Sequence, residues 1–229
     1  MSSHEISQHQ QPVVATTTNS LLKQFNDPLD CLTAHLMLEC AEVLAGVKPA
    51  NLISLVNRTR PCGRNPYHLW QQLGDRVLSR FSTLQVMLLH NKGTAVLLLC
   101  YNKSSLDQRL AHSGIRALLQ KAGYRPESGT DALLDELKQR IAHNGAFPHE
   151  IGLFIGYPAK DVAAFMGLVK LPFTCQGPWK IYGNPRQSLS LADQFRHKRQ
   201  WMGVRLSGCT SPGPCLDELN RNRQHFFAD

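Results

Sequence analysis

Apolar residues in the first part of the chain recur every three or four positions, which is the spacing of one face of a helix. Asn26-Asp27-Pro28 joins a capping residue to a proline suited to the first helical turn, so a helix is predicted from here to Gly46. The same spacing predicts a short second helix over residues 49–56 and a third helix that begins after Asn65-Pro66. The first third of the chain is therefore predicted to be mainly helical.

Two short apolar runs, residues 84–89 and 95–101, then replace the helical spacing. The turn sequence His90-Asn91-Lys92-Gly93-Thr94 joins them and predicts an antiparallel hairpin. Helical spacing returns after this hairpin. Residues 151–155 are apolar on both faces and predict a central third strand, and residues 179–182 predict a fourth. A last amphipathic helix is predicted to follow, with its basic residues on the outer side.

This order of elements lacks the regular alternation of strand and helix that marks a doubly wound fold. We therefore predict an α+β (irregular α/β) fold, with a small mixed sheet of about four strands covered by helices. The 229 residues suit one domain, which we assign to residues 26–205. Residues 1–25 are predicted to be a disordered arm, and residues 206–229 an irregular tail.

The composition is that of a soluble globular protein, because 42% of the residues are hydrophobic and 18% are charged. No stretch reaches the ~18 apolar residues of a membrane-spanning helix. The N-terminus also lacks the basic and apolar segments of a secretory signal. These observations predict a cytoplasmic protein that does not contact a membrane.

The net charge of +8 favours anionic partners, and the positive residues gather toward the C-terminus. They are Lys180, Arg186, Arg196, Lys198, Arg199 and Arg205. One interpretation is a solvated basic face. The alternative is a nucleic-acid-binding protein that uses this basic C-terminal helix. No recognised nucleic-acid motif accompanies the charge, so only weak, non-specific nucleic-acid binding is expected.

Seven cysteines show no C-x-x-C pair, and no two histidines are four residues apart, so no metal site is predicted. Cys31, Cys40 and Cys100 lie in apolar contexts and are predicted to be buried and unpaired. Cys209 and Cys215 flank a turn-rich loop. We interpret them as two incidental surface thiols, rather than as metal ligands or a labile disulfide.

Residues 147–162 form the most unusual stretch of the sequence. A predicted strand, a turn at Gly156-Tyr157-Pro158 and a helix start together favour an anion-binding corner. His149 and Glu150 are candidate acid–base groups, although adjacent residues of a strand point to opposite faces. The alternative is that the glycines accommodate packing and that His149 and Glu150 only begin the strand.

Two other segments carry suitable cations. Lys48-Pro49-Ala50-Asn51 lies at a predicted helix start, where the lysine and free amides can hold a phosphate or carboxylate. Lys180 lies between two aromatic residues in the predicted fourth strand. Together with Gly156 and Tyr157, these segments predict one pocket for a small anionic ligand or cofactor of unknown identity, in an enzyme or in a non-catalytic binding protein.

Cys40 is a further candidate, since an ammonium such as that of Lys48 lowers the pKa of a nearby thiol and makes it a better nucleophile. Its place among apolar residues at helical spacing favours a buried structural thiol instead.

Three blocks of this sequence resemble an uncharacterised bacterial family, domain of unknown function 3793. They are residues 40–52, 147–162 and 177–182, and the similarity spans roughly residues 31–205. After Cys40 the chain reads Ala-Glu-Val, where the family pattern has a Pro-Thr pair before the leucine. The resemblance implies no established activity, cofactor or catalytic residue.

Overall fold

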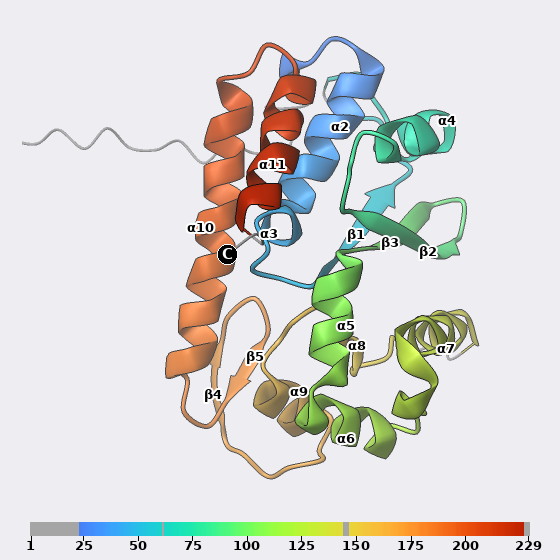
Figure 1. The fold of residues 1–229 in the computed structure, drawn as a ribbon. Coiled ribbons are helices and arrows are strands. Elements are labelled where there is room, and N and C mark those ends of the chain that lie inside the picture. Colours follow the sequence, from blue (N-terminus) through green and yellow to red (C-terminus); the bar gives the residue numbers. More distant parts are fainter. Residues whose placement is uncertain (1–22, 61, 144–146, 227–229) are drawn as a thin grey trace, which may run out of the picture.

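A three-stranded antiparallel sheet lies at the centre of the structure (Figure 1). In the order in which they pair, its strands are β1 (Ala50–Val56), β3 (Ala95–Tyr101) and β2 (Gln85–Asn91). The structure is a computed structural model that describes residues 23–60, 62–143 and 147–226. β2 and β3 form the predicted antiparallel hairpin, which is confirmed, with a bulge between Leu88 and His90.

Side chains of β3 alternate between two hydrophobic cores, because successive residues of a strand point to opposite faces. Val96, Leu98 and Cys100 are buried in one core, which we call the upper core. Leu99 and Tyr101 are buried in the other, the lower core. The sheet therefore separates two halves of a single α+β domain, and this fold class confirms the prediction.

Five helices enclose the upper core (Figure 1). They are α2 (Pro28–Glu39), α3 (Ala41–Leu44), α4 (Pro66–Leu78), α10 (Arg186–Ser207) and α11 (Pro212–Phe226). Asp27 and Asn65 cap α2 and α4, each with a proline in the first turn, as the sequence predicts. The long helix α10 runs along one side of the molecule from the lower half to the upper half.

Further helices pack on the opposite face of the sheet and build the lower half. They are α5 (Lys103–Ala111), α6 (Ser113–Lys121), the 3-10 helix η1 (Pro126–Ser128), α7 (Gly129–His143), α8 (Ile151–Phe154) and α9 (Ala159–Phe165). A second hairpin, β4 (Phe173–Gln176) and β5 (Lys180–Tyr182), packs against the start of α10. β5 confirms the predicted fourth strand, whereas β4 was not predicted.

Two predicted elements are wrong. Residues 50–56 form strand β1 and not a helix: Ile53 and Leu55 are buried at a spacing of two and alternate with the more exposed Leu52, Ser54 and Val56. Residues 151–155 form the helical turn α8 and not a central strand, and the N–H of Ile155 donates to the carbonyl of Ile151. A short apolar run that is buried on all sides fits either structure. The single mixed sheet is consequently two antiparallel sheets.

The predicted domain limits also change at both ends. Phe25 is buried in the upper core, so the folded body begins before residue 26; most of the predicted arm, residues 1–22, lies outside the described residues. The predicted irregular tail contains α11, whose Leu216 is 1% exposed. Pro212 begins this helix in a position that proline favours, and its apolar residues complete the upper core.

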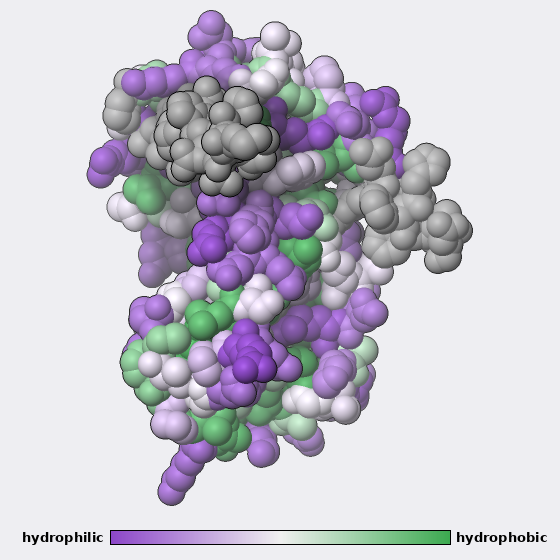
Figure 2. All heavy atoms as spheres, turned by 90° about the vertical axis from the view of Figure 1, so that its left-hand side faces the viewer, coloured by the Kyte–Doolittle hydropathy of each residue, from purple (hydrophilic) through white to green (hydrophobic). Residues whose placement is uncertain are grey.

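Figure 2 looks onto the face that carries α10 and β4. Hydrophobic residues reach the surface in its lower part, whereas hydrophilic side chains dominate the middle. Exposed apolar side chains of this half include Phe165, Leu171 and Phe173. Within the described residues, no helix combines the length and the apolar character needed to cross a membrane.

Candidate functional site

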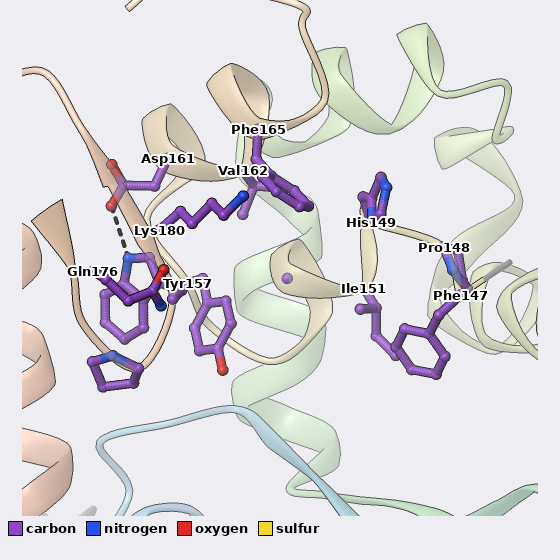
Figure 3. Close-up of a pocket in the computed structure, with 13 residues that line it drawn as sticks. Phe147, Pro148, His149, Ile151, Tyr157, Asp161, Val162, Phe165, Gln176 and Lys180 are labelled. Atoms are coloured by element: carbon purple, nitrogen blue, oxygen red, sulfur yellow. Dashed lines mark hydrogen bonds between the residues drawn. The ribbon is translucent and has the colours of Figure 1, made fainter. Parts of the chain in front are cut away.

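Two of the sequence blocks that carry the family resemblance face each other across a cavity of about 290 Å³ (Figure 3). One side comes from residues 147–162, which include α8 and the start of α9. The other side comes from residues 178–180, which lead into β5, and Phe165 and Gln176 complete the lining. We call this space the aromatic cavity, because Phe147, Tyr157, Phe165 and Trp179 form much of its wall.

Asp161 joins the two sides of the aromatic cavity. Its carboxylate is 1% exposed, and its Oδ2 accepts hydrogen bonds from Trp179 Nε1 (2.9 Å, Figure 3) and Ser188 Oγ (2.6 Å). Its Oδ1 accepts from the N–H of Tyr182 (2.9 Å) and from Lys160 Nζ (2.7 Å). One carboxylate thereby ties α9 to β5 and to α10.

The four donors also determine the charge of Asp161. Burial raises the pKa of this carboxyl group, but the hydrogen bonds from Lys160, Ser188, Tyr182 and Trp179 outweigh it, so the pKa lies below its ordinary value. The carboxylate therefore stays ionised at neutral pH with its acceptor positions occupied. The structure, and not the sequence, reveals Asp161 as the centre of this network.

Tyr157 and Trp179 form a stacked pair in the cavity wall, with ring centroids 4.5 Å apart. Gly152 allows this wall to close, because a Cβ there would lie 2.8 Å from Val162 Cγ2 and 3.3 Å from the Tyr157 ring. Trp179 is 7% exposed, whereas its neighbour Lys180 is exposed, as the alternation along the predicted strand requires.

Lys180 and His149 are the polar side chains that reach into the aromatic cavity beside Phe165. Lys180 Nζ lies 5.2 Å from the centroid of the Phe165 ring, and the His149 ring meets the same ring edge-on with centroids 4.7 Å apart. Figure 3 shows Lys180 extended toward Phe165, with His149 beyond it. Neither side chain has a hydrogen bond or ion pair within the described part of the chain.

Glu150 does not share the site of His149. Its side chain points into the lower core, where it accepts from the Tyr124 hydroxyl (3.1 Å) and from Arg140 Nη1 (3.2 Å). Burial, followed by the charge of Glu150, raises the pKa of Tyr124. The two acid–base candidates therefore diverge, as adjacent residues were expected to, although they begin a helical turn and not a strand.

Gly156 has φ of +93° and turns the chain toward Pro49. A Cβ at Gly156 would lie 2.7 Å from Pro49 Cδ and 3.4 Å from Lys48 Cγ. Proline thus occupies the space beside the bare backbone where we expected a ligand. This glycine serves the packing of two distant segments, which was the alternative interpretation of the turn.

Lys48 and Asn51 lie behind the Tyr157 ring. Lys48 is 6% exposed, its Nζ donates to Asn51 Oδ1 (2.7 Å), and Asn51 Nδ2 donates to the carbonyl of Glu39 (2.6 Å). The ammonium lies 5.5 Å from the centroid of the Tyr157 ring. Burial lowers the pKa of Lys48, the charge of Glu42 partly opposes this effect and that of Arg199 adds to it, and the resulting pKa is about 8.

The three segments of the predicted pocket therefore meet at Tyr157, but they do not form one pocket. Lys180 and Tyr157 line the aromatic cavity, whereas Lys48 lines a separate cavity described below. Asn51 is the hydrogen-bond partner of Lys48 and lines neither cavity.

The seven cysteines comprise three that are buried, two that are partly buried (Cys62 and Cys175) and two that form a disulfide. Cys31, Cys40 and Cys100 are buried and outside any disulfide, as predicted. Burial raises the pKa of the Cys40 thiol, and its neighbour Cys100 adds to this effect, so the geometry does not favour Cys40 as a nucleophile. Cys209 and Cys215 form a disulfide, which corrects their interpretation as incidental thiols: the turn-rich loop folds back between α10 and α11 and brings their Cα atoms to 7.0 Å.

The basic residues of α10 are partly engaged within the protein. Arg199 contacts the carboxylates of Glu39 (3.1 Å) and Glu42 (3.0 Å), and Arg205 pairs with Glu218. Across the residues that the structure describes, no group of three or more His, Cys, Asp or Glu side chains is arranged to hold a metal ion.

The profile of a family described as "Protein of unknown function (DUF3793)" matches residues 36–213, which run from α2 into the start of α11. No curated protein and no solved structure matches the chain. The matched region contains every residue that lines the aromatic cavity. The resemblance carried by residues 40–52, 147–162 and 177–182 is thereby confirmed, and the chain belongs to the family of domain of unknown function 3793.

Proposed function

We propose that this is a cytoplasmic protein that binds a small anionic ligand or cofactor with a flat apolar body, and that the aromatic cavity is its binding site. A largely apolar wall with a few polar groups is typical of small-molecule sites, and about 290 Å³ is near the lower end of their size range. The exposed rings of Phe147 and Phe165 at the rim extend the apolar surface that such a body can cover.

The charge balance of this cavity is the observation that carries the proposal. Asp161 and Lys180 are the two charged residues of the lining. Asp161 is occupied by four donors, whereas the ammonium of Lys180 has no carboxylate partner among the described residues. The cavity should therefore bind a ligand whose anionic group lies beside Lys180. The apolar body of that ligand would pack against Tyr157 and Trp179.

His149 is the second polar contact in this proposal. Of the three catalytic candidates, His149 lines the cavity, whereas Glu150 and Cys40 are buried elsewhere. An imidazole at this position can donate to or accept from the ligand, and it is the group through which a bound ligand would exchange a proton.

Two fluorescent probes with the same kind of body test the proposal. 8-Anilinonaphthalene-1-sulfonate has a sulfonate, and N-phenyl-1-naphthylamine lacks it. In Lys180→Met, the dissociation constant of the sulfonate probe should rise about tenfold, since a charged hydrogen bond contributes roughly 1.5–3 kcal/mol, while that of the neutral probe stays unchanged.

Lys170→Met is the matched control, because Lys170 is an exposed lysine outside the lining. Equal effects of the two substitutions on the sulfonate probe would show that the probe reports general surface charge, and the proposed site would be wrong.

The alternative, nucleic-acid binding by α10, has less support because Arg199 and Arg205 are held by carboxylates. We expect weak binding to single- or double-stranded DNA that disappears near 150 mM salt, since released counterions drive such contacts. Fluorescence anisotropy with a labelled oligonucleotide measures this. Tight binding at ~150 mM salt that is lost in an Arg196→Ser, Lys198→Ser double variant would favour the alternative.

A further inference from the structure

A second cavity, of about 500 Å³, lies between residues 46–49, α5 and the first turn of α6. We call it the basic cavity. Three of its lining residues can carry positive charge, namely Lys48, Arg109 and His112, and none of the eleven is acidic. Ser105 and Gln108 of α5 add neutral polar groups.

Arg109 is the central feature of the basic cavity. Its Nε donates to the carbonyl of Leu153 and its Nη2 to the carbonyl of Tyr157, both at 2.5 Å. These two bonds leave the N–H groups of Nη1 without a partner in the described residues. No carboxylate of the described chain pairs with this guanidinium, and burial lowers the pKa of Arg109 to about 10.

A partly buried cation without a counter-ion carries a desolvation cost that a bound anion would offset. The Asp161 carboxylate of the neighbouring cavity is already occupied by four donors, from Lys160, Trp179, Tyr182 and Ser188. Arg109 therefore lines a cavity whose described residues supply no negative charge.

His112 supplies a second donor at the edge of this cavity. Its Nδ1 accepts a hydrogen bond from the N–H of Gly114 (3.2 Å), at the start of α6. A ring whose Nδ1 is an acceptor has its proton on Nε2 when neutral, so Nε2 is a donor at neutral pH. The lining therefore offers an oxyanion several hydrogen-bond donors: the guanidinium of Arg109, the imidazole N–H of His112, the hydroxyl of Ser105 and the side-chain amide of Gln108.

We propose that the basic cavity is a second, independent site that binds an oxyanion group, a phosphate or a carboxylate, through Nη1 of Arg109 and Nε2 of His112. Lys48 also lines this cavity, and its ammonium, which donates to Asn51 Oδ1, adds positive electrostatic potential there. This proposal does not depend on the ligand of the aromatic cavity.

The probes are inorganic phosphate and acetate, compared at equal ionic strength by isothermal titration calorimetry on the full chain. Arg109 also holds two backbone carbonyls, so its replacement disturbs the fold together with the site. Gln108→Glu avoids this problem: it introduces a carboxylate of nearly the same shape at an exposed position of the lining. Gln120→Glu is the matched control, with the same charge change on α6 outside the basic cavity.

We expect wild type to bind phosphate or acetate, and Gln120→Glu to bind the same anion with the same affinity. Gln108→Glu should bind that anion at least about tenfold more weakly, because its carboxylate repels the anion. The tighter anion identifies the chemical group. Lys170→Met, a substitution of an exposed lysine outside both cavities, should leave this binding unchanged, which separates the site from general surface charge. Absence of phosphate and acetate binding at 10 mM, or equal binding by both glutamate variants, would overturn the proposal.

Discussion

The two cavities meet at the turn of Gly156 and Tyr157, yet they balance their charges in opposite ways. In the aromatic cavity the carboxylate of Asp161 is buried and held by four donors, and the cation, Lys180, is exposed. In the basic cavity the cation, Arg109, is partly buried, and none of the described lining residues is acidic. The buried charge of the first cavity is fully hydrogen-bonded without a ligand, whereas the cation of the second has no acid partner in the described lining.

This difference concerns the protein without a ligand, because an anion at either site stabilises the fold only as far as its affinity and concentration allow. At Lys180 the anion would meet a solvated ammonium. At Arg109 it would meet a guanidinium that is partly removed from water. The substitutions below act on each part of this comparison.

Asp161→Asn should have the largest effect. The amide keeps the shape but turns NH₂ donors toward groups that themselves donate, so the free energy of unfolding should fall by about 3 kcal/mol. Urea denaturation measures this, with Asp193→Asn, on the exposed side of α10, as the control. A change below ~1 kcal/mol would show that the four hydrogen bonds do not hold the aromatic cavity together.

The pH dependence of the same variant sharpens the test. The pKa of Asp161 is lower in the folded protein than its unfolded value of about 3.9, so its stabilisation is complete above that value and is lost as pH falls through the folded pKa. Asp161→Asn should therefore be less sensitive to acid below pH 4 than wild type.

Gly156→Ala should have the next largest effect. The left-handed φ costs an alanine about 1 kcal/mol, and the approach of the new Cβ to Pro49 adds overpacking of about 1–3 kcal/mol. Gly167→Ala is the matched control, because Gly167 follows the end of α9 with φ of +74° but a Cβ added there would meet no atom within 4 Å. Equal losses in thermal or urea unfolding would mean that the contact between this turn and Pro49 contributes nothing.

The sequence predicts those parts of the fold that depend on local chemistry. The Asn/Gly turn predicts the hairpin of β2 and β3, and the capping residues Asp27 and Asn65 predict the starts of α2 and α4. The errors lie where the burial pattern is ambiguous. Leu52, Leu55 and Val56 fit helical spacing, but pairing with β3 makes residues 50–56 a strand.

Only part of the candidate site was predicted, because the sequence identifies a residue from its local context and not from its distant partners. Tyr157 and Lys180 were identified because their own segments are unusual, and the structure brings both to one cavity. Asp161 was missed as the centre of a network, since its partners Trp179 and Ser188 lie 18 and 27 residues away. Arg109 was missed because nothing near it in sequence marks it; its partners are the backbone carbonyls of Leu153 and Tyr157.

Lys48 provides a pH test on the side of the basic cavity. Its pKa is about 8 in the folded protein and about 10.4 when unfolded, so between these values the unfolded chain binds a proton that the folded chain has released. This group therefore makes stability rise with pH over that interval, by on the order of 2 kcal/mol.

Lys48→Met should remove this rise. The measurement is the difference in free energy of unfolding between wild type and variant at pH 7.5 and pH 10, which cancels the other titrating groups; Lys170→Met, an exposed lysine, is the control. If the difference does not change with pH, Lys48 is solvated and does not contribute to the buried positive charge at the basic cavity.

The smallest effect concerns communication between the cavities. Tyr157 belongs to both, because its ring lines the aromatic cavity and its carbonyl accepts from Arg109. An oxyanion that orders Arg109 should hold this turn in place, and saturating concentrations should tighten N-phenyl-1-naphthylamine binding about twofold. The neutral probe is used because an anionic one would also register direct repulsion. Thermodynamic linkage requires the probe to tighten anion binding by the same factor, and Gln108→Glu should abolish both effects. A twofold change that persists in Gln108→Glu would be a general salt effect, and the two cavities would then act independently.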